Sequence, residues 1–322
     1  MTTAAREISL DALRDATKFV YRAAVRTPLV RVDVPTAHEG IDLYLKLEVL
    51  QPIGSFKIRG AVNVLRQLSA DELADGVWTV SAGNAALGVA YAARQAGVSC
   101  SVMVMDTAPA AKVDAINRLG ATIVRVSYDE AWKTVERHGS DRMRGYFIHP
   151  FDDDRFIAGN ATAALEIFED LPDVDVIVGS VGGGGLLSGV VAATRAIRPQ
   201  TKVFAAEPET AAPLSASLAA GRPMYFAGWR ASFVDGAGGK SVLETMWPLL
   251  REVSGSIVVT LDEVARAIRV VAERAHVIAE GAAGCAVAAA LSGHAGRGKI
   301  AAIVSGGNID LSRFFEIIKS SD

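Results

Sequence analysis

The sequence predicts an α/β protein with two open, parallel-type sheets flanked by helices. Strand-like and helix-like segments alternate from Val77 to the end of the chain. The strand-like segments are nearly continuous runs of Val and Ile, as expected of parallel strands that are buried on both faces. Glycines such as Gly97 stand where helices are expected to end.

The repeating units fall into two blocks. In the first block, we expect strands at 77–81, 101–105, 122–126 and 146–149, with helices at 85–95, 110–119 and 129–138. In the second, we expect strands at 174–178, 202–206 and 299–305, with helices at 185–197, 261–275, 281–291 and 311–318. No proline-rich or low-complexity linker separates the blocks, so two domains should meet over a broad interface that leaves a cleft.

Composition excludes several classes of function. The formal net charge is −3 and no block of Lys or Arg occurs, which argues against nucleic-acid and anionic-membrane partners. Cys100 and Cys285 are the only cysteines and the five histidines are scattered, so we expect neither disulfides nor a structural metal. With no signal-peptide pattern and no apolar run of membrane-spanning length, the sequence favours a reduced, cytoplasmic protein.

The first chemical motif is the segment from Gly54 to Ala61, in which Lys57 stands between Phe56 and Ile58. Burial would disfavour the ammonium form and lower the pKa of such a lysine. A neutral amine can form a Schiff base and can accept a proton. The alternative is an ordinary surface lysine in the first turn of a helix.

A run of four glycines follows the strand expected at 174–178. Gly182, Gly183, Gly184 and Gly185 leave backbone N–H groups unshielded, and a helix begins directly behind them. This arrangement suits a phosphate. The dinucleotide pattern G-x-G-x-x-G fails, because Leu187 or Ser188 occupies its third glycine position. A tight turn without a ligand is the structural alternative.

Two further turns lie at expected strand ends. Ser81-Ala82-Gly83-Asn84 offers N–H groups and a hydroxyl that suit a carboxylate, although Asn84 taken alone is better explained by helix capping. Ser305-Gly306-Gly307-Asn308 is weak evidence by itself.

Together, these motifs resemble the fold-type II pyridoxal-phosphate enzymes, which are tryptophan synthase β-like, and within them the threonine dehydratase and serine racemase branch. The resemblance covers nearly the whole chain. It also includes five shorter motifs, Thr27-Pro28-Leu29, Lys46-Leu47-Glu48, His149-Pro150-Phe151, Glu207-Pro208 and Asp235-Gly236. It implies a large cofactor domain of residues 1–66 and 152–322, a small domain of residues 67–151 that carries the Ser81–Asn84 loop, and a homodimer.

The resemblance also implies roles for individual residues. Lys57 would bind pyridoxal 5'-phosphate and then remove the α-proton of the substrate. The other cofactor contacts would be Phe56 beside the ring, Asn84 at its 3′-oxygen, Gly182 to Gly185 with Leu186 at the phosphate, Ser305 at the pyridine nitrogen, and Gly236 and Glu280 along the ring. Ser81, Ala82 and Gly83 would hold the substrate carboxylate, with Ala85 next to them.

The expected reaction is β-elimination. A neutral hydroxyl such as that of Ser305 makes the cofactor ring a weaker electron sink than an aspartate would, which disfavours transamination. A 3-hydroxy L-amino acid would lose its α-proton to Lys57 and its hydroxyl as water. Hydrolysis then gives a 2-oxo acid and ammonia, so the sequence indicates an ammonia-lyase of the serine or threonine dehydratase type.

The chain departs from its relatives at several positions. Ala85 and Leu87 replace the usual His and Gln, which would admit a bulkier substrate such as phenylserine unless both residues only pack. Ala82 replaces the serine that serves serine racemases as a second acid, which argues against racemisation. Pro213 stands where a second acidic ligand would accompany Glu207, so we expect no tight divalent-cation site.

Three alternatives stay open at this point. A serine racemase or a β-replacement enzyme would use the same cofactor. A non-catalytic pyridoxal-phosphate-binding protein would be expected to lack the lysine, whereas Lys57 is present. The preferred substrate and its β-stereochemistry, cation binding near Glu207 and any allosteric effector do not follow from the sequence.

Overall fold

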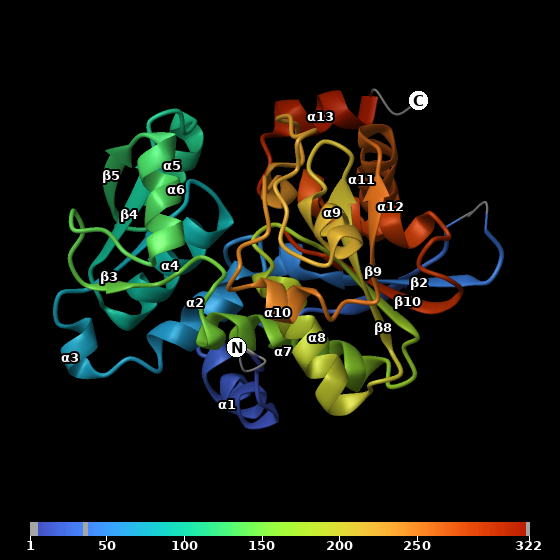
Figure 1. Ribbon diagram of the computed structural model, residues 1–322, viewed down its shortest axis with the longest axis horizontal. Helices are drawn as coiled ribbons and strands as arrows, with labels where there is room; N and C mark the ends of the chain where they lie inside the picture. The colour runs from blue at the N-terminus through green and yellow to red at the C-terminus, as the bar shows by residue number, and fades with distance from the viewer. Residues whose placement is uncertain (1–5, 35–37, 320–322) are drawn as a thin grey trace.

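The computed structural model describes residues 6–34 and 38–319 and arranges them around two sheets (Figure 1). In the larger sheet the strands are ordered β1-β2-β10-β7-β8-β9. Their bounds are β1 Leu29–Val32, β2 Ile41–Leu47, β7 Val176–Ser180, β8 Lys202–Pro208, β9 Gly255–Val259 and β10 Gly298–Val304. The prediction of a parallel-type sheet needs one correction, since β1 runs antiparallel to β2. Only residues 33–40 join these two strands, too few for the helical crossover that a parallel pair requires.

The smaller sheet is parallel throughout, in the order β5-β4-β3-β6. Its strands are β3 Val77–Val80, β4 Cys100–Met105, β5 Thr122–Val126 and β6 Tyr146–Phe147. The strand predicted at 146–149 is therefore shorter than expected. After β6 the chain continues to the helix Asp154–Asp170, which packs against helices of the larger sheet, and this ends the pairing of β6.

Helices flank both sheets, some where the sequence predicted them and some where it did not. The helices that the sequence predicted are α4 Asn84–Ala96, α5 Ala110–Asn117, α6 Tyr128–Arg137, α8 Gly185–Ile197, α11 Leu261–Ala275, α12 Gly281–Leu291 and α13 Leu311–Lys319. Those that it did not predict are α1 Leu10–Val20, α2 Lys57–Leu65, α3 Ala70–Leu73, α7 Asp154–Asp170, α9 Pro213–Ala220 and α10 Trp247–Leu250, with 3-10 turns η1 Glu48–Leu50 and η2 Asp235–Ala237. No helix of the described ranges is long and apolar enough to cross a membrane.

Strand β10 shows why the strand sequences are continuously apolar. Ile300, Ala302 and Val304 belong to the hydrophobic cluster on the side of α11 and α12. Ala301 and Ile303 belong to the cluster on the side of α1, α7 and α8. Because successive residues point to opposite faces, a strand covered on both sides must be apolar at every position.

Helix α2 lies between the two sheets and packs against α4 and α7 (Figure 1). Small residues permit this approach. A Cβ atom at Gly88 of α4 would lie 3.0 Å from the carbonyl oxygen of Lys57, and one at Gly159 of α7 would lie 2.5 Å from that of Arg59. The packing fixes the first turn of α2, where Lys57 stands.

Candidate active site

Lys57 is the first residue of α2, and its side chain is half-buried. Its Nζ donates a hydrogen bond to the carbonyl oxygen of Pro150 at 2.6 Å, and the rings of Phe56 and Phe156 each lie 5.3 Å from Nζ. Burial lowers the pKa of Lys57 to about 8. A substantial fraction of the amine is therefore neutral near physiological pH, as nucleophilic attack and proton abstraction require.

A cluster of buried charges anchors α2 directly behind Lys57. The guanidinium of Arg59 is fully buried and pairs with Glu48 at 2.7 Å and with Glu166 at 2.7 Å. Lys46 donates to Glu166 at 2.5 Å. Two cations thus face two carboxylates, and the hydrogen bonds satisfy the charges that burial would otherwise penalise. Of this cluster, the sequence motifs included Lys46, Glu48 and Arg59 but missed Glu166, which lies on the unpredicted helix α7.

The glycine loop, Gly182 to Gly185, connects β7 to α8 as predicted. A Cβ atom at Gly183 would lie 2.2 Å from the ring of Phe151, and one at Gly182 would lie 2.5 Å from the carbonyl oxygen of Gly236. Side chains therefore cannot be accommodated here. Within the described part of the chain, no acceptor is found for the backbone N–H groups from Gly182 to Leu186. These donors lie at the positive end of the α8 dipole, an arrangement that suits a phosphate.

The Ser81–Asn84 turn connects β3 to α4 and meets the larger sheet through Asn84. The amide nitrogen of Asn84 donates to Oε1 of Glu280 at 2.8 Å, and its oxygen accepts from Asn308 at 2.7 Å. Ser81 Oγ accepts from the N–H of Gly83 at 3.1 Å. The N–H groups of Ala82, Asn84 and Ala85 have no acceptor among the residues described, and are therefore able to bind an anion.

The Ser305–Asn308 turn joins these parts. The carbonyl oxygen of Ser305 accepts from the N–H of Phe56 at 3.0 Å, and that of Gly306 accepts from the N–H of Glu280 at 3.0 Å. Asn308 also donates to the carbonyl oxygen of Ile53 at 2.8 Å. Hydrogen bonds thus link four segments that are distant in sequence: residues 53–57, residues 81–84, Glu280 and residues 305–308. The glycine loop is a fifth segment, which contacts Gly236 and Phe151.

Known proteins resemble the chain over nearly its full length. A family model described as "Pyridoxal-phosphate dependent enzyme" matches residues 20–306. The chain belongs to this family. L-threonine ammonia-lyase of Thermotoga maritima is 38% identical over 97% of this chain and 78% of its own. Serine racemase of Dictyostelium discoideum is 34% identical over 97% of this chain and 98% of its own. The structure of maize serine racemase superposes with a TM-score of 0.89 at 32% identity, covering 98% of both chains.

The residues of this pyridoxal-phosphate-dependent enzyme fit its cofactor. The unpaired N–H groups of the glycine loop suit the phosphate, and the buried amine of Lys57 suits the aldehyde. Glu280 is buried, and burial together with the nearby Asp235 raises the pKa of its carboxyl to about 7. This raised pKa keeps much of Glu280 uncharged near neutral pH.

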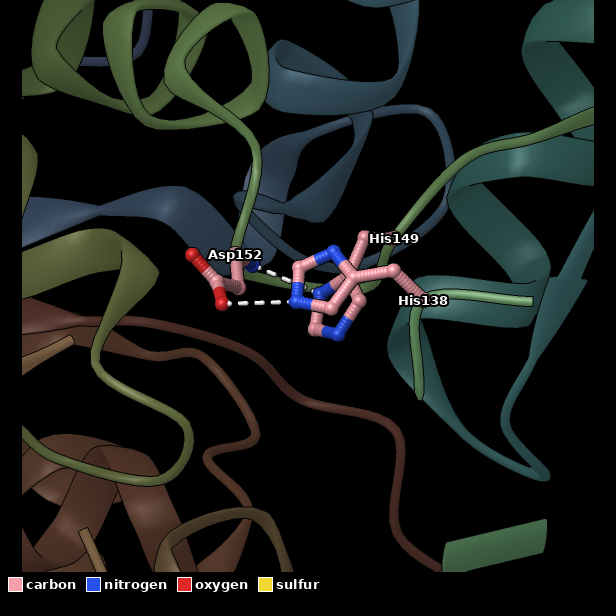
Figure 2. A group of neighbouring side chains, drawn as sticks. All are labelled: His138, His149 and Asp152. Carbon is pink, nitrogen blue, oxygen red and sulfur yellow. Dashed lines mark hydrogen bonds and ion pairs between the residues drawn. The ribbon is translucent and has the colours of Figure 1, made fainter. Parts of the chain in front are cut away.

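Figure 2 shows a group that sequence analysis missed: His138, His149 and Asp152, whose ligand-type atoms lie within 4.8 Å of one another. His138 Nε2 lies 3.0 Å from Asp152 Oδ2, and His149 Nδ1 accepts from the N–H of Asp152 at 2.7 Å. Asp152 also accepts from Arg6 and Thr245. These atoms are already engaged with one another and with neighbouring groups, so the cluster is a hydrogen-bond network. His149 belonged to a motif of the family resemblance, but His138 and Asp152 did not, so the sequence did not indicate that the three lie together.

Glu207 is likewise committed to protein donors. Its carboxylate accepts from the N–H groups of Leu214 and Ser215, each at 2.7 Å, and from the hydroxyl of Ser256 at 2.6 Å. It thereby satisfies the N–H groups at the start of α9, where Pro213 stands. Burial raises the pKa of Glu207.

Proposed function

We propose that this enzyme is a dehydratase that converts a 3-hydroxy L-amino acid of the threonine or serine type to a 2-oxo acid and ammonia. The observation that carries the proposal is the placement of the Lys57 amine on a helix that packs against α4, whose preceding turn contains Ala82. Lys57 would serve as the base, and the methyl group of Ala82 supplies no second acid at the position where serine racemases carry a serine. The similarity to L-threonine ammonia-lyase supports this choice.

In the proposed site, Lys57 and Phe56 attach and flank the cofactor, and Asn84, Ser305, Gly236 and Glu280 surround its ring. Gly182 to Gly185 and Leu186 bind its phosphate. Ser81, Ala82 and Gly83 bind the substrate carboxylate. When bound, the cofactor withdraws electrons from the α-carbon of the substrate and so makes its proton removable.

The residues of the chain supply the proton transfers. The Nζ of Lys57 removes the α-proton, and the β-hydroxyl takes up one proton and leaves as water, so that the substrate loses an α-proton and a hydroxide overall. Because the hydroxyl of Ser305 cannot stabilise a positive charge on the ring nitrogen as a carboxylate would, prompt loss of the β-substituent is favoured over a long-lived carbanion. Hydrolysis of the resulting enamine product releases the 2-oxo acid and ammonia.

The size of the substrate side chain is a further part of the proposal. Ala85 is buried and Leu87 packs partly against the main core cluster. Their small or apolar side chains remove polar groups next to the substrate turn, which supports acceptance of an apolar β-substituent such as the phenyl ring of phenylserine. Packing against the core is the competing explanation of both residues.

A panel of substrates tests the function. Release of 2-oxo acid is measured from L-serine, L-threonine, L-threo-3-hydroxyaspartate and L-phenylserine, with Lys57→Ala as the control. We expect turnover of at least one substrate and its loss in the variant. Absence of release from all four, with the cofactor bound, would contradict the proposal and favour β-replacement or racemisation.

The family resemblance supports four further proposals. They are a large domain of residues 1–66 and 152–322, a small domain of residues 67–151, a homodimer and a cytoplasmic location. Sedimentation of the purified protein tests the dimer, and a monomeric mass at micromolar concentration would contradict it.

A further inference from the structure

The segment that leads from the smaller sheet to α7, residues 148–152, contacts two parts of the proposed site. The carbonyl oxygen of Pro150 accepts the hydrogen bond from Lys57 Nζ at 2.6 Å. The next residue, Phe151, packs against the glycine loop so closely that a Cβ atom at Gly183 would overlap its ring. The conformation of this crossover segment therefore determines the surroundings of both the amine and the loop.

His149 holds the crossover segment in place. Its side chain is buried, with 2% of its surface exposed. Nδ1 accepts from the N–H of Asp152 at 2.7 Å and from that of Phe151 at 3.3 Å, so the ring bridges across Pro150. Nε2 lies 3.2 Å from the carbonyl oxygen of Val135 on α6. Two donors at Nδ1 and an acceptor at Nε2 are satisfied together only by a neutral ring that carries its hydrogen on Nε2.

The surroundings of His149 favour the neutral ring. The ring of His138 stacks on it at 4.4 Å between centroids, and the ring of Phe151 meets it edge-on at 4.7 Å. The titratable groups that act on it are His138, Asp152 and Lys57. Burial, followed by the influence of His138, lowers the pKa of His149 to about 3. Nδ1 therefore remains an acceptor at any pH at which the enzyme would work.

We propose that His149 is a positioning residue, which fixes the Pro150 carbonyl as the docking point for the free amine of Lys57. The inference rests on the proposed role of Lys57. That amine is free before the cofactor is attached and again whenever a substrate has displaced it. An unheld lysine side chain samples many rotamers, whereas one hydrogen-bonded to a fixed carbonyl keeps its nitrogen close to the reacting atoms.

A matched pair of substitutions tests the proposal. In His149→Asn the amide oxygen occupies the place of Nδ1 and can still accept from the backbone N–H groups. In His149→Gln the amide reaches the place of Nε2 instead, so the bond to Val135 is kept and the backbone acceptor is lost. His149→Phe retains the volume and the stacking but no acceptor.

The main readout needs no substrate. Cofactor-free protein is mixed with pyridoxal phosphate, and attachment to Lys57 is followed by borohydride reduction and mass measurement. We expect attachment to be slower by about tenfold in His149→Gln and His149→Phe, the effect of about one hydrogen bond, and nearly unchanged in His149→Asn. In the holoenzymes, kcat should be lower in His149→Gln and His149→Phe than in His149→Asn, while KM changes little.

Two results would overturn the proposal. Attachment in His149→Gln at the wild-type rate would show that the acceptor is not needed. Faster cofactor attachment in His149→Phe than in His149→Asn would show that the ring only fills space. Thermal unfolding of each variant identifies any that fails to fold. If one of His149→Gln and His149→Phe does not fold, the other still provides the comparison with His149→Asn. If the wild-type protein attaches the cofactor but converts no hydroxy amino acid, the proposed dehydratase activity fails while the attachment rates still test His149.

Discussion

At the residue scale, burial shifts the pKa values of Lys57 and Glu280 toward neutrality from opposite directions. The pKa of Lys57 is lowered to about 8, and that of Glu280 is raised to about 7 by burial and by Asp235. Asn84 donates to Glu280, so this carboxyl is linked to the turn that precedes α4. Such opposed shifts are common in sites that transfer protons near neutral pH.

The Glu280 carboxyl should reduce stability as the pH rises. Because its pKa is about 7 in the folded protein and near 4.5 when unfolded, the folded state binds more protons between these values, and stability is lost from about pH 4.5 to 7. Glu280→Gln in the cofactor-free protein should therefore raise the melting temperature by a few degrees at pH 8 and little at pH 4.5. Exposed Glu244→Gln is the control for thermal unfolding at both values. An equal change at both pH values would contradict the assignment.

Ala82 should decide between elimination and racemisation. In Ala82→Ser a hydroxyl is placed in the substrate turn, where it can protonate the α-carbon on a second face. We expect this variant to form D-serine from L-serine above the wild-type background, as measured by chiral chromatography. Ala85→Ser adds the same group at a neighbouring position and should not do so. Elimination without any D-serine in Ala82→Ser would exclude this explanation of the reaction type.

At the element scale, α2 depends on the buried charges behind Lys57. Although burial opposes its ionisation, the bonds and charges of Arg59 and Lys46 hold the pKa of Glu166 below its ordinary value. Glu166→Gln leaves Lys46 without a charged partner and should reduce the free energy of unfolding by about 3 kcal/mol. Denaturant titration measures the change, with Glu169→Gln on the same helix as the control. Loss of less than about 0.5 kcal/mol would show that the cluster is not structurally important.

Local sequence patterns could predict some of these strands and helices but not others. Strands such as β4 and β10 are short apolar runs bounded by turns, so their length and flanking residues identify them as strands. The antiparallel pairing of β1 depends on a short connection rather than on composition. Helix α7 is buried along most of its length, so it lacks the apolar stripe by which an amphipathic helix is found.

At the scale of the whole molecule, contacts outside the site join the two sheets. Lys112 on α5 pairs with Asp235 at 2.6 Å. Lys240 lies 4.5 Å from the ring centroid of Tyr128 on α6 and 4.3 Å from that of Trp229. Of these residues, only Asp235 belonged to a sequence motif, and that motif did not indicate Lys112 as its partner. Long-range contacts of this kind follow from the fold, whereas glycine loops and a lysine between apolar residues are visible in the sequence.

The Lys240 contact should restrain α6. Removing the cation in Lys240→Met loses about 1 kcal/mol of cation–π attraction, and amide hydrogens in the first turn of α6 should exchange about fivefold faster. Hydrogen exchange followed by mass spectrometry measures this, with exposed Lys133→Met on the same helix as the control. Equal exchange in the two variants would show that Lys240 does not couple the segments.

Removal of the α-proton by Lys57, followed by β-elimination, is the central step of the proposed reaction. The most direct measurement incubates the holoenzyme with the L-3-hydroxy amino acid that it converts fastest, in deuterated water, and quantifies 2-oxo acid, ammonia and both enantiomers of the remaining substrate. We predict equal amounts of 2-oxo acid and ammonia, with no D-enantiomer. Accumulation of deuterated D-amino acid as the main product would contradict the account and identify the enzyme as a racemase.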